Sequence, residues 1–161
     1  MRIRVVPQIF YRQYCLPDST RPVYEDPESS FWKEKNFITI RHSSEKDPFC
    51  AIPVEGENIL RLRFDDVTED PDGTLILFDQ TMAGQIRDFI AKIDPEKDLF
   101  INCAAGISRS GAVGDVLNDY FNKFLGFNAL DDYYFKQYNR QIQPNPLVRR
   151  ILHNELFNSE R

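Results

Sequence analysis

The alternation of apolar and polar residues along the chain predicts several short strands. Two segments, Phe37–Arg41 and Ile59–Phe64, alternate with the two-residue period of a half-buried strand. The apolar run Ile3–Val6, which Pro7 stops, and the apolar residues Leu99 to Ile101 indicate two further strands. In the Ile59–Phe64 strand, one face carries Ile59, Arg61 and Arg63, and the other carries Leu60, Leu62 and Phe64.

A helical apolar period predicts four helices in the second half of the chain. Asp79 has the side chain of an N-cap and precedes the first of them, and a second helix starts near Ser108 and ends near Gly126. Asn128 begins the third, and Asn145 followed by Pro146 begins the last, because proline is favourable in a first turn. The stripes expected to be buried are Met82, Ile86, Phe89, Ile90 and Ile93 on the first helix, and Val113, Val116, Leu117, Tyr120, Phe121 and Phe124 on the second.

This order of elements predicts an α/β fold, with a central, largely parallel sheet that helices cover on both faces. The 161 residues suit one domain, spanning 1–161, with a sizeable core. Prolines, acidic residues and small polar residues between Leu16 and Ser30 indicate an irregular surface segment. The aromatic residues around this segment are expected to anchor the core: Tyr11, Tyr14, Phe31 and Trp32.

The stretch from Leu99 to Gly111 joins the end of a buried strand to the start of a helix through a loop of small residues. The first amides of a helix have no partner within it, so such a loop is suited to binding an anion. Arg109 adds a planar fork of donors, and this setting should depress the pKa of Cys103 below that of a free thiol. The expected phosphate-binding residues are Ala104, Ala105, Gly106, Ile107, Ser108 and Arg109.

The segment Cys-Ala-Ala-Gly-Ile-Ser-Arg-Ser from Cys103 to Ser110 resembles the Cys-x5-Arg signature of the cysteine-dependent protein tyrosine phosphatase superfamily, above all its dual-specificity branch. Arg140–Asn145 resembles the Arg-x-Ile-x-Pro-Asn segment before the last helix of that branch. The resemblance implies that Cys103 is the nucleophile, that Arg109 binds phosphate and that Ser110 eases departure of the thiolate. One departure is Asn102, which stands where the family has a histidine. Asparagine can still donate a hydrogen bond, so we interpret this change as tuning the activation of Cys103 and not as inactivation.

The resemblance also implies a general acid on a loop that follows a strand well before the cysteine. Phe64-Asp65-Asp66 resembles the Val-Glu-Asp-like triplet that ends in this acid. Asp66 is therefore the first candidate for the acid, and Asp65 is the second. Three more carboxylates in the same loop are expected to be solvated turn residues: Glu69, Asp70 and Asp72.

Charge and cysteine content restrict the function further. A net charge of -5 argues against broad attraction to nucleic acid or to anionic membranes. No long apolar run follows Met1, so we expect a cytoplasmic protein without a secretory signal or a membrane-spanning helix. The three cysteines lack a Cys-x2-Cys zinc pattern, so we expect no metal and no cofactor. Cys15 and Cys50 are expected to be structural, rather than disulfide partners of Cys103, and His42 and His153 to lie on the surface or in packing contacts.

These observations predict metal-independent hydrolysis of phosphate esters through a phosphocysteine, by a protein tyrosine or dual-specificity phosphatase. The neutral loop residues favour a phosphorylated protein or a small phosphoester, because superfamily members that act on phosphoinositides or nucleotide polyphosphates tend to carry basic loop residues. Pocket depth would decide between phosphotyrosine and phosphoserine. The alternative is a phosphate-binding adaptor without turnover, a pseudophosphatase. We expect a monomer.

Overall fold

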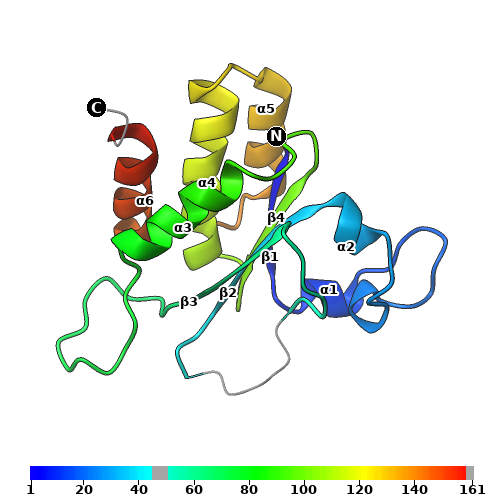
Figure 1. Cartoon of the computed structure of the whole chain (residues 1–161), viewed down its shortest axis with the longest axis horizontal. Helices are drawn as coiled ribbons and strands as arrows, with labels where there is room; N and C mark the ends of the chain where they lie inside the picture. Colours follow the sequence, from blue (N-terminus) through cyan, green and yellow to red (C-terminus); the bar gives the residue numbers. More distant parts are fainter. Residues whose placement is uncertain (45–50, 159–161) are drawn as a thin grey trace.

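A computed structural model describes residues 1–44 and 51–158 of the chain (Figure 1). Asp47-Pro48, which the sequence places in a polar turn region, and Cys50 lie outside the described residues. The sheet has four parallel strands in the order β1-β4-β2-β3. Their bounds are Ile3–Pro7 for β1, Asn36–Arg41 for β2, Ile59–Arg63 for β3 and Leu99–Cys103 for β4.

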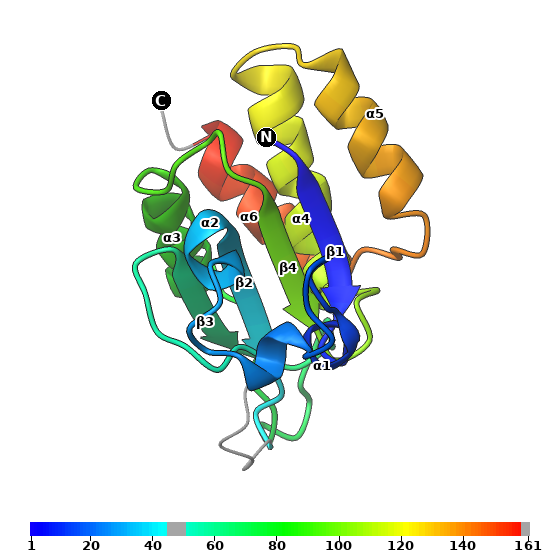
Figure 2. The same cartoon turned by 90° about the vertical axis from the view of Figure 1, so that its right-hand side faces the viewer.

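Four long helices lie on one side of this sheet, and their apolar residues form the larger core with one face of the strands (Figure 2). Helix α6 packs against both α3 and α4. Helix α5 packs beside β1 and α4. Their bounds are Gln80–Ile90 for α3, Arg109–Asp119 for α4, Ala129–Tyr138 for α5 and Pro146–Asn158 for α6.

Short helical segments cover the other face of the sheet, where a second core is rich in aromatic rings (Figure 1). They are α1 (Phe10–Gln13), η1 (Val23–Glu25) and α2 (Phe31–Glu34). Helices thus lie on both faces of a parallel sheet, as the order of elements predicted. The predicted anchors Tyr11, Phe31 and Trp32 are buried here, whereas Tyr14 is half-buried.

Polar caps fix the starts of three helices at the predicted places. Asp79 accepts a hydrogen bond from the amide of Met82 at 3.0 Å, and Asn128 accepts one from the amide of Asp131 at 3.1 Å. Asn145 accepts from two amides in the first turn of α6. A cap depends on residues three positions apart at most, which is why the sequence alone predicts it.

The end of the stripe on α4 was predicted wrongly. A π-helical turn, η2 (Tyr120–Phe124), continues this helix, and the side chain of Phe124 is 51% exposed. The wider turn changes the number of residues per turn, so Phe124 lies out of line with the buried stripe and packs on the partly buried rings of Tyr120 and Phe157. Val113, Val116 and Leu117, which precede the π-helical turn, are buried as predicted. No helix within residues 1–44 and 51–158 has the length and apolar character needed to cross a membrane.

Candidate active site

The candidate nucleophile lies where β4 ends and the loop to α4 begins. Cys103 is 2% exposed, and its Sγ lies 3.0 Å from the hydroxyl oxygen of Ser110. Burial acts to raise the pKa of the Cys103 thiol. Hydrogen bonds from the Ser110 side chain and from the amides of Ser110, Ile107 and Gly106 outweigh it, so the pKa is lowered overall. This loop therefore favours a thiolate.

Flanking segments hold the loop by its carbonyl groups. The amide of Gln8 donates to the carbonyl of Ala104 at 3.2 Å, and the amide of Gln143 donates to that of Ile107 at 3.0 Å. The amide of Asn145 donates to the carbonyl of Ser108 at 3.1 Å. Because a peptide group is planar and trans, a carbonyl turned outward leaves the next amide turned inward, toward the site of an anion.

Gly106 allows this loop to pass close to β1. Its φ is +69°, a conformation that other residues rarely adopt, and a Cβ there would lie 2.5 Å from the backbone of Pro7 and Val6. Its carbonyl accepts a hydrogen bond from Gln141 Nε2 at 3.3 Å, and the same nitrogen donates to Val5 at 3.1 Å. Gly106 is therefore required by both its conformation and its surroundings.

Arg109 is held with one edge of its guanidinium group unoccupied. The side chain is buried, with 4% exposed, and Nη1 donates to the carbonyl of Phe64 at 3.0 Å. Its buried Nε has no hydrogen-bond partner among the described residues. A guanidinium edge of this kind matches two oxygens of a phosphate. Arg109 and Cys103 line one cavity of about 360 Å³ with Asp66 and the loop residues Ala104, Ala105, Ile107 and Ser108.

The two candidate acids have different surroundings. Asp65 is 3% exposed and accepts hydrogen bonds from the amides of Ser43 and Ile76, at 3.0 and 2.8 Å. Its Oδ1 also lies 3.1 Å from Nδ1 of His42. Burial acts to raise the pKa of Asp65, but the hydrogen bonds from Ile76, Ser43 and His42 outweigh it and lower the pKa to about 2. This carboxylate stabilises the loop and does not line the cavity of Cys103.

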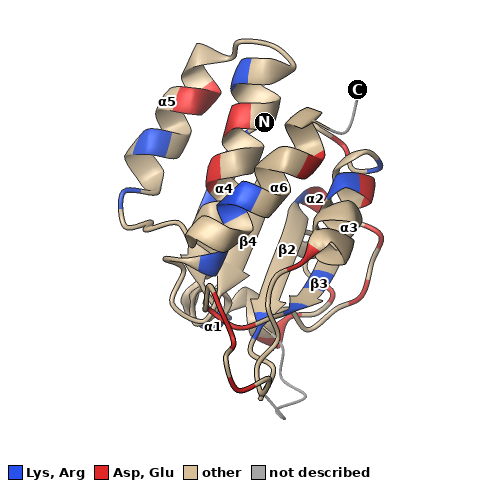
Figure 3. Ribbon diagram, turned by 90° about the vertical axis from the view of Figure 1, so that its left-hand side faces the viewer, with Lys and Arg blue, Asp and Glu red and all other residues tan. Residues whose placement is uncertain are grey.

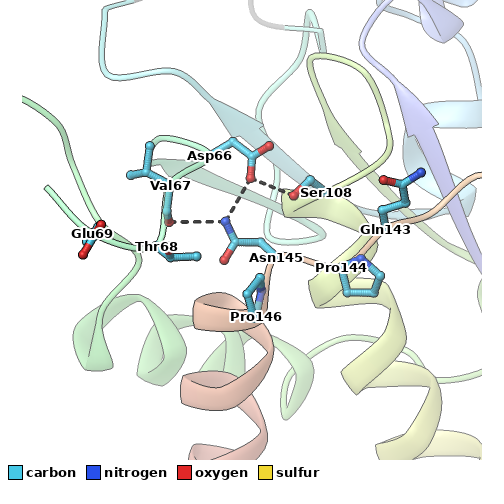
Figure 4. A pocket seen from close by; sticks show the side chains of 9 residues that line it. All are labelled: Asp66, Val67, Thr68, Glu69, Ser108, Gln143, Pro144, Asn145 and Pro146. Carbon is cyan, nitrogen blue, oxygen red and sulfur yellow. Dashed lines mark hydrogen bonds between the residues drawn. The ribbon is translucent and has the colours of Figure 1, made fainter.

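Asp66 instead is exposed and lies at the edge of the cavity that contains Cys103. Its Oδ1 accepts hydrogen bonds from the hydroxyl of Ser108 at 2.7 Å and from Nδ2 of Asn145 at 2.9 Å (Figure 4). The other oxygen, Oδ2, makes no hydrogen bond with the described residues. Asp66 is thus tied both to the loop of Cys103 and to the start of α6. The sequence predicted Asn145 only as the start of the last helix and predicted no role for Gln141, although both lie in the segment that carries the second resemblance.

Asn102, the departure from the family pattern, lies next to Cys103 in β4 but on the opposite face of the sheet. It pairs with Val6 and Thr39 and is 1% exposed. Its Oδ1 is buried without a hydrogen-bond partner among the described residues. Its effect on the thiol stays a prediction.

The remaining candidates lie apart from this cavity. Cys15 is half-buried, with its sulfur 3.9 Å from the carbonyl oxygen of Gln13. His42 contacts Asp65, and the ring of His153 stacks on Phe157. Within the described ranges, no three His, Cys, Asp or Glu side chains gather as ligands of a metal ion would.

Solved structures share this fold, and one of them is named as a phosphatase. Cydia pomonella PTP-2 phosphatase matches with a TM-score of 0.55 and 15% identity, over 96% of this chain and 85% of that chain. PTPMT1 in complex with PI(5)P matches with a TM-score of 0.50 and 10% identity, over 98% of this chain and 91% of that chain. No family model matches the sequence, and no curated protein matches it significantly. The chain therefore has the fold of the protein tyrosine phosphatases, in agreement with the resemblance of its Cys-x5-Arg segment.

Proposed function

We propose that the protein hydrolyses phosphate monoesters through a phosphocysteine intermediate, as a protein tyrosine or dual-specificity phosphatase. One observation carries this proposal. A cavity of about 360 Å³ contains a buried cysteine whose pKa is lowered, an arginine with an unoccupied guanidinium edge, and a carboxyl group at its rim. This is the set of groups that covalent phosphoryl transfer needs: a nucleophile, donors for the phosphoryl oxygens and a general acid.

In the first step, the thiolate of Cys103 attacks phosphorus, and the bond between phosphorus and the ester oxygen breaks. The loop amides and the Nε edge of Arg109 bind the three non-bridging oxygens, on which negative charge is spread in the transition state. Asp66, in its protonated form, gives its proton to the departing oxygen. The products are the free alcohol or phenol, a phosphocysteine and the Asp66 carboxylate.

In the second step, a water molecule attacks the phosphocysteine, and Asp66 accepts the proton that the water loses. The bond between phosphorus and sulfur breaks, which releases inorganic phosphate and restores the thiolate. The hydroxyl of Ser110, 3.0 Å from Sγ, stabilises the departing thiolate by a hydrogen bond. Apart from the substrate and this water molecule, both steps use side chains and amides of this chain.

Two observations support Asp66 rather than Asp65 as the general acid. Asp66 is at the rim of the cavity with Oδ2 unoccupied among the described residues, whereas both oxygens of Asp65 accept hydrogen bonds from elsewhere. The hydrogen bonds that lower the pKa of Asp65 to about 2 also stabilise its charged form, so its protonated form is harder to populate than that of an ordinary carboxyl group.

The test is hydrolysis of aryl phosphates in EDTA by the wild type and three variants, Cys103→Ser, Asp66→Asn and Asp65→Asn. We expect no turnover by Cys103→Ser and a loss of about 10²- to 10⁴-fold for Asp66→Asn. The loss should be larger for phenyl phosphate than for 4-nitrophenyl phosphate, because a poor leaving group depends more on the proton. Asp65→Asn is the matched control, and its activity should follow only the folded fraction, measured by circular dichroism.

Pure wild-type protein that binds phosphate but hydrolyses no aryl phosphate would refute the proposal and favour the adaptor. Equal activity of wild type and Cys103→Ser would assign the turnover to a contaminant. With activity established, phosphotyrosine, phosphoserine and phosphothreonine peptides of otherwise identical sequence decide between a tyrosine phosphatase and a dual-specificity phosphatase.

A further inference from the structure

A second cavity, of about 650 Å³, adjoins the one that contains Cys103. Figure 4 shows the residues that line the second cavity. The two cavities share three lining residues, Asp66, Ser108 and Gln143, so they adjoin each other. The loop after β3 forms one wall of the second cavity, and the segment that leads into α6 forms the other. The residues of these walls are Val67, Thr68 and Glu69 on the first, and Pro144, Asn145 and Pro146 on the second.

The chemistry proposed above determines what would enter this second cavity. Arg109 is 4% exposed, and the unoccupied edge of its guanidinium group places the phosphoryl group in the first cavity. The ester oxygen leaves on the side away from Cys103, where Asp66 would protonate it. Asp66 also lines the second cavity. The part of the substrate that is bonded to the ester oxygen therefore lies at the entrance of the second cavity.

The lining of the second cavity is acidic as well as apolar. It contains the carboxylates of Asp66 and Glu69 and no Lys or Arg. Figure 3 shows acidic residues along this loop between β3 and α3. Glu69 is exposed and forms no ion pair with any described residue. Val67, Pro144 and Pro146 add apolar surface, on which the methylene stem of a lysine or arginine can lie while its charge reaches a carboxylate.

We propose that this cavity binds the peptide residue next to the phosphorylated one, and that Glu69 makes it prefer a basic side chain over an acidic one. The proposal rests on the proposed function and deepens it. It names the substrate as a phosphorylated protein segment with an adjacent Lys or Arg. A ligand that carries further phosphate groups, such as an inositol polyphosphate, would bring anions toward Glu69 and is disfavoured.

The test uses phosphotyrosine peptides that carry Lys, Ala or Glu at the position before or after the phosphotyrosine. Their affinities are measured by calorimetry with the Cys103→Ser protein, which cannot turn them over, and their kcat/KM values with the wild type. At low salt we expect the affinity and kcat/KM of the Lys peptide to exceed those of the Glu peptide by about tenfold at one of the two positions. The reason is that exchanging Lys for Glu turns one attractive charge pair with Glu69 into a repulsive one. The ratio should shrink at high salt.

Two variants assign the effect to Glu69. Glu69→Lys should invert the preference, and Glu69→Gln should bring the ratio of Lys to Glu peptides close to one. The matched control is Asp72→Asn, which removes the same charge from the same loop but lies outside the lining of both cavities. This variant should keep the wild-type ratio and the wild-type hydrolysis of 4-nitrophenyl phosphate.

The outcomes separate the two proposals. Suppose that the wild type hydrolyses 4-nitrophenyl phosphate but shows the same affinity and the same kcat/KM for Lys and Glu peptides. This result would refute the proposed subsite and leave the proposed phosphatase activity standing. The same applies if Asp72→Asn abolishes the preference as fully as Glu69→Gln, or if an inositol polyphosphate is hydrolysed better than every peptide. If the protein neither hydrolyses phosphate esters nor binds the peptides, the proposed function is refuted, and the subsite that rests on it is refuted as well.

Discussion

Gly106→Ala tests how the loop of Cys103 is held against β1. The new methyl group would lie 2.5 Å from Pro7 N and Val6 C and 2.8 Å from the Val6 carbonyl oxygen, and these are backbone atoms that cannot rotate away. Alanine at a φ of +69° costs about 1–2 kcal/mol in itself. Overpacking adds about 1–3 kcal/mol. We therefore expect the free energy of unfolding to fall by about 2–5 kcal/mol.

Gly73→Ala is the matched control, because Gly73 has nearly the same conformation without the close contacts. Its φ is +67°, and among the described residues other than its two chain neighbours no atom lies within 4 Å of the position of a Cβ. It should cost only the conformational part, about 1–2 kcal/mol. Urea denaturation of both variants and the wild type measures the difference. Folded Gly106→Ala protein should also lose about 10²-fold in kcat/KM for aryl phosphates, because the loop amides shift by a fraction of an ångström to about 1 Å.

Equal destabilisation by the two substitutions would refute this reasoning, since it would mean that the close contact with β1 adds nothing to the cost. A Gly106→Ala protein with wild-type activity would show that the loop can move away from β1 without displacing its amides. The first result would leave conformational strain as the sole reason for glycine at this position.

Three other predictions concern the thiol, the buried carboxylate and the core. Ser110→Ala removes a hydrogen bond to Cys103, so the pKa of the thiol should rise, and iodoacetamide should inactivate the variant more slowly than the wild type at pH 6. Asp65→Asn should lower the free energy of unfolding at pH 7 by about 1–3 kcal/mol, because an amide cannot accept all the hydrogen bonds of the carboxylate. The pKa of Asp65 in the folded protein is depressed to about 2, so the stabilisation by its carboxylate is present above pH 4 and is lost as the pH falls toward 2. Urea titrations that show the same difference in the free energy of unfolding between wild type and variant at pH 7 and at pH 2.5 would contradict this. Leu117→Ala should cost about 2–5 kcal/mol in thermal or urea unfolding. Phe124→Ser should cost less, about 1 kcal/mol, because its half-exposed ring loses only the contacts with the rings of Tyr120 and Phe157. Similar costs for the two variants would contradict the placement of Phe124 outside the buried stripe.

The fold class and the centre of the candidate site were predictable because their signals are local. The strand before Cys103 and the helix after Arg109 follow from periodicity over a few residues. The N-caps Asp79 and Asn128 bond within three residues of themselves. In the same way, the parallel sheet follows from strands and helices that alternate along the chain.

Other features depend on residues that are distant in the sequence, so only the tertiary structure decided them. Asp65 and Asp66 are adjacent and chemically alike, but Asp65 meets Ser43 and Ile76 while Asp66 meets Asn145. The choice between the two acids therefore depends on how the loop after β3 packs against its neighbours. No periodicity within that loop carries this information.

The sequence by itself predicted which residues would carry the proposed chemistry, because the Cys103 to Arg109 loop is one continuous segment between a strand and a helix. The tertiary structure decided how that loop is held, by β1 on one side and by residues 141–145 on the other. It also decided that a second cavity with Glu69 in its wall opens beside the first. Walls formed by segments about 75 residues apart arise only when the chain folds, because backbone hydrogen bonds and side-chain packing bring them together.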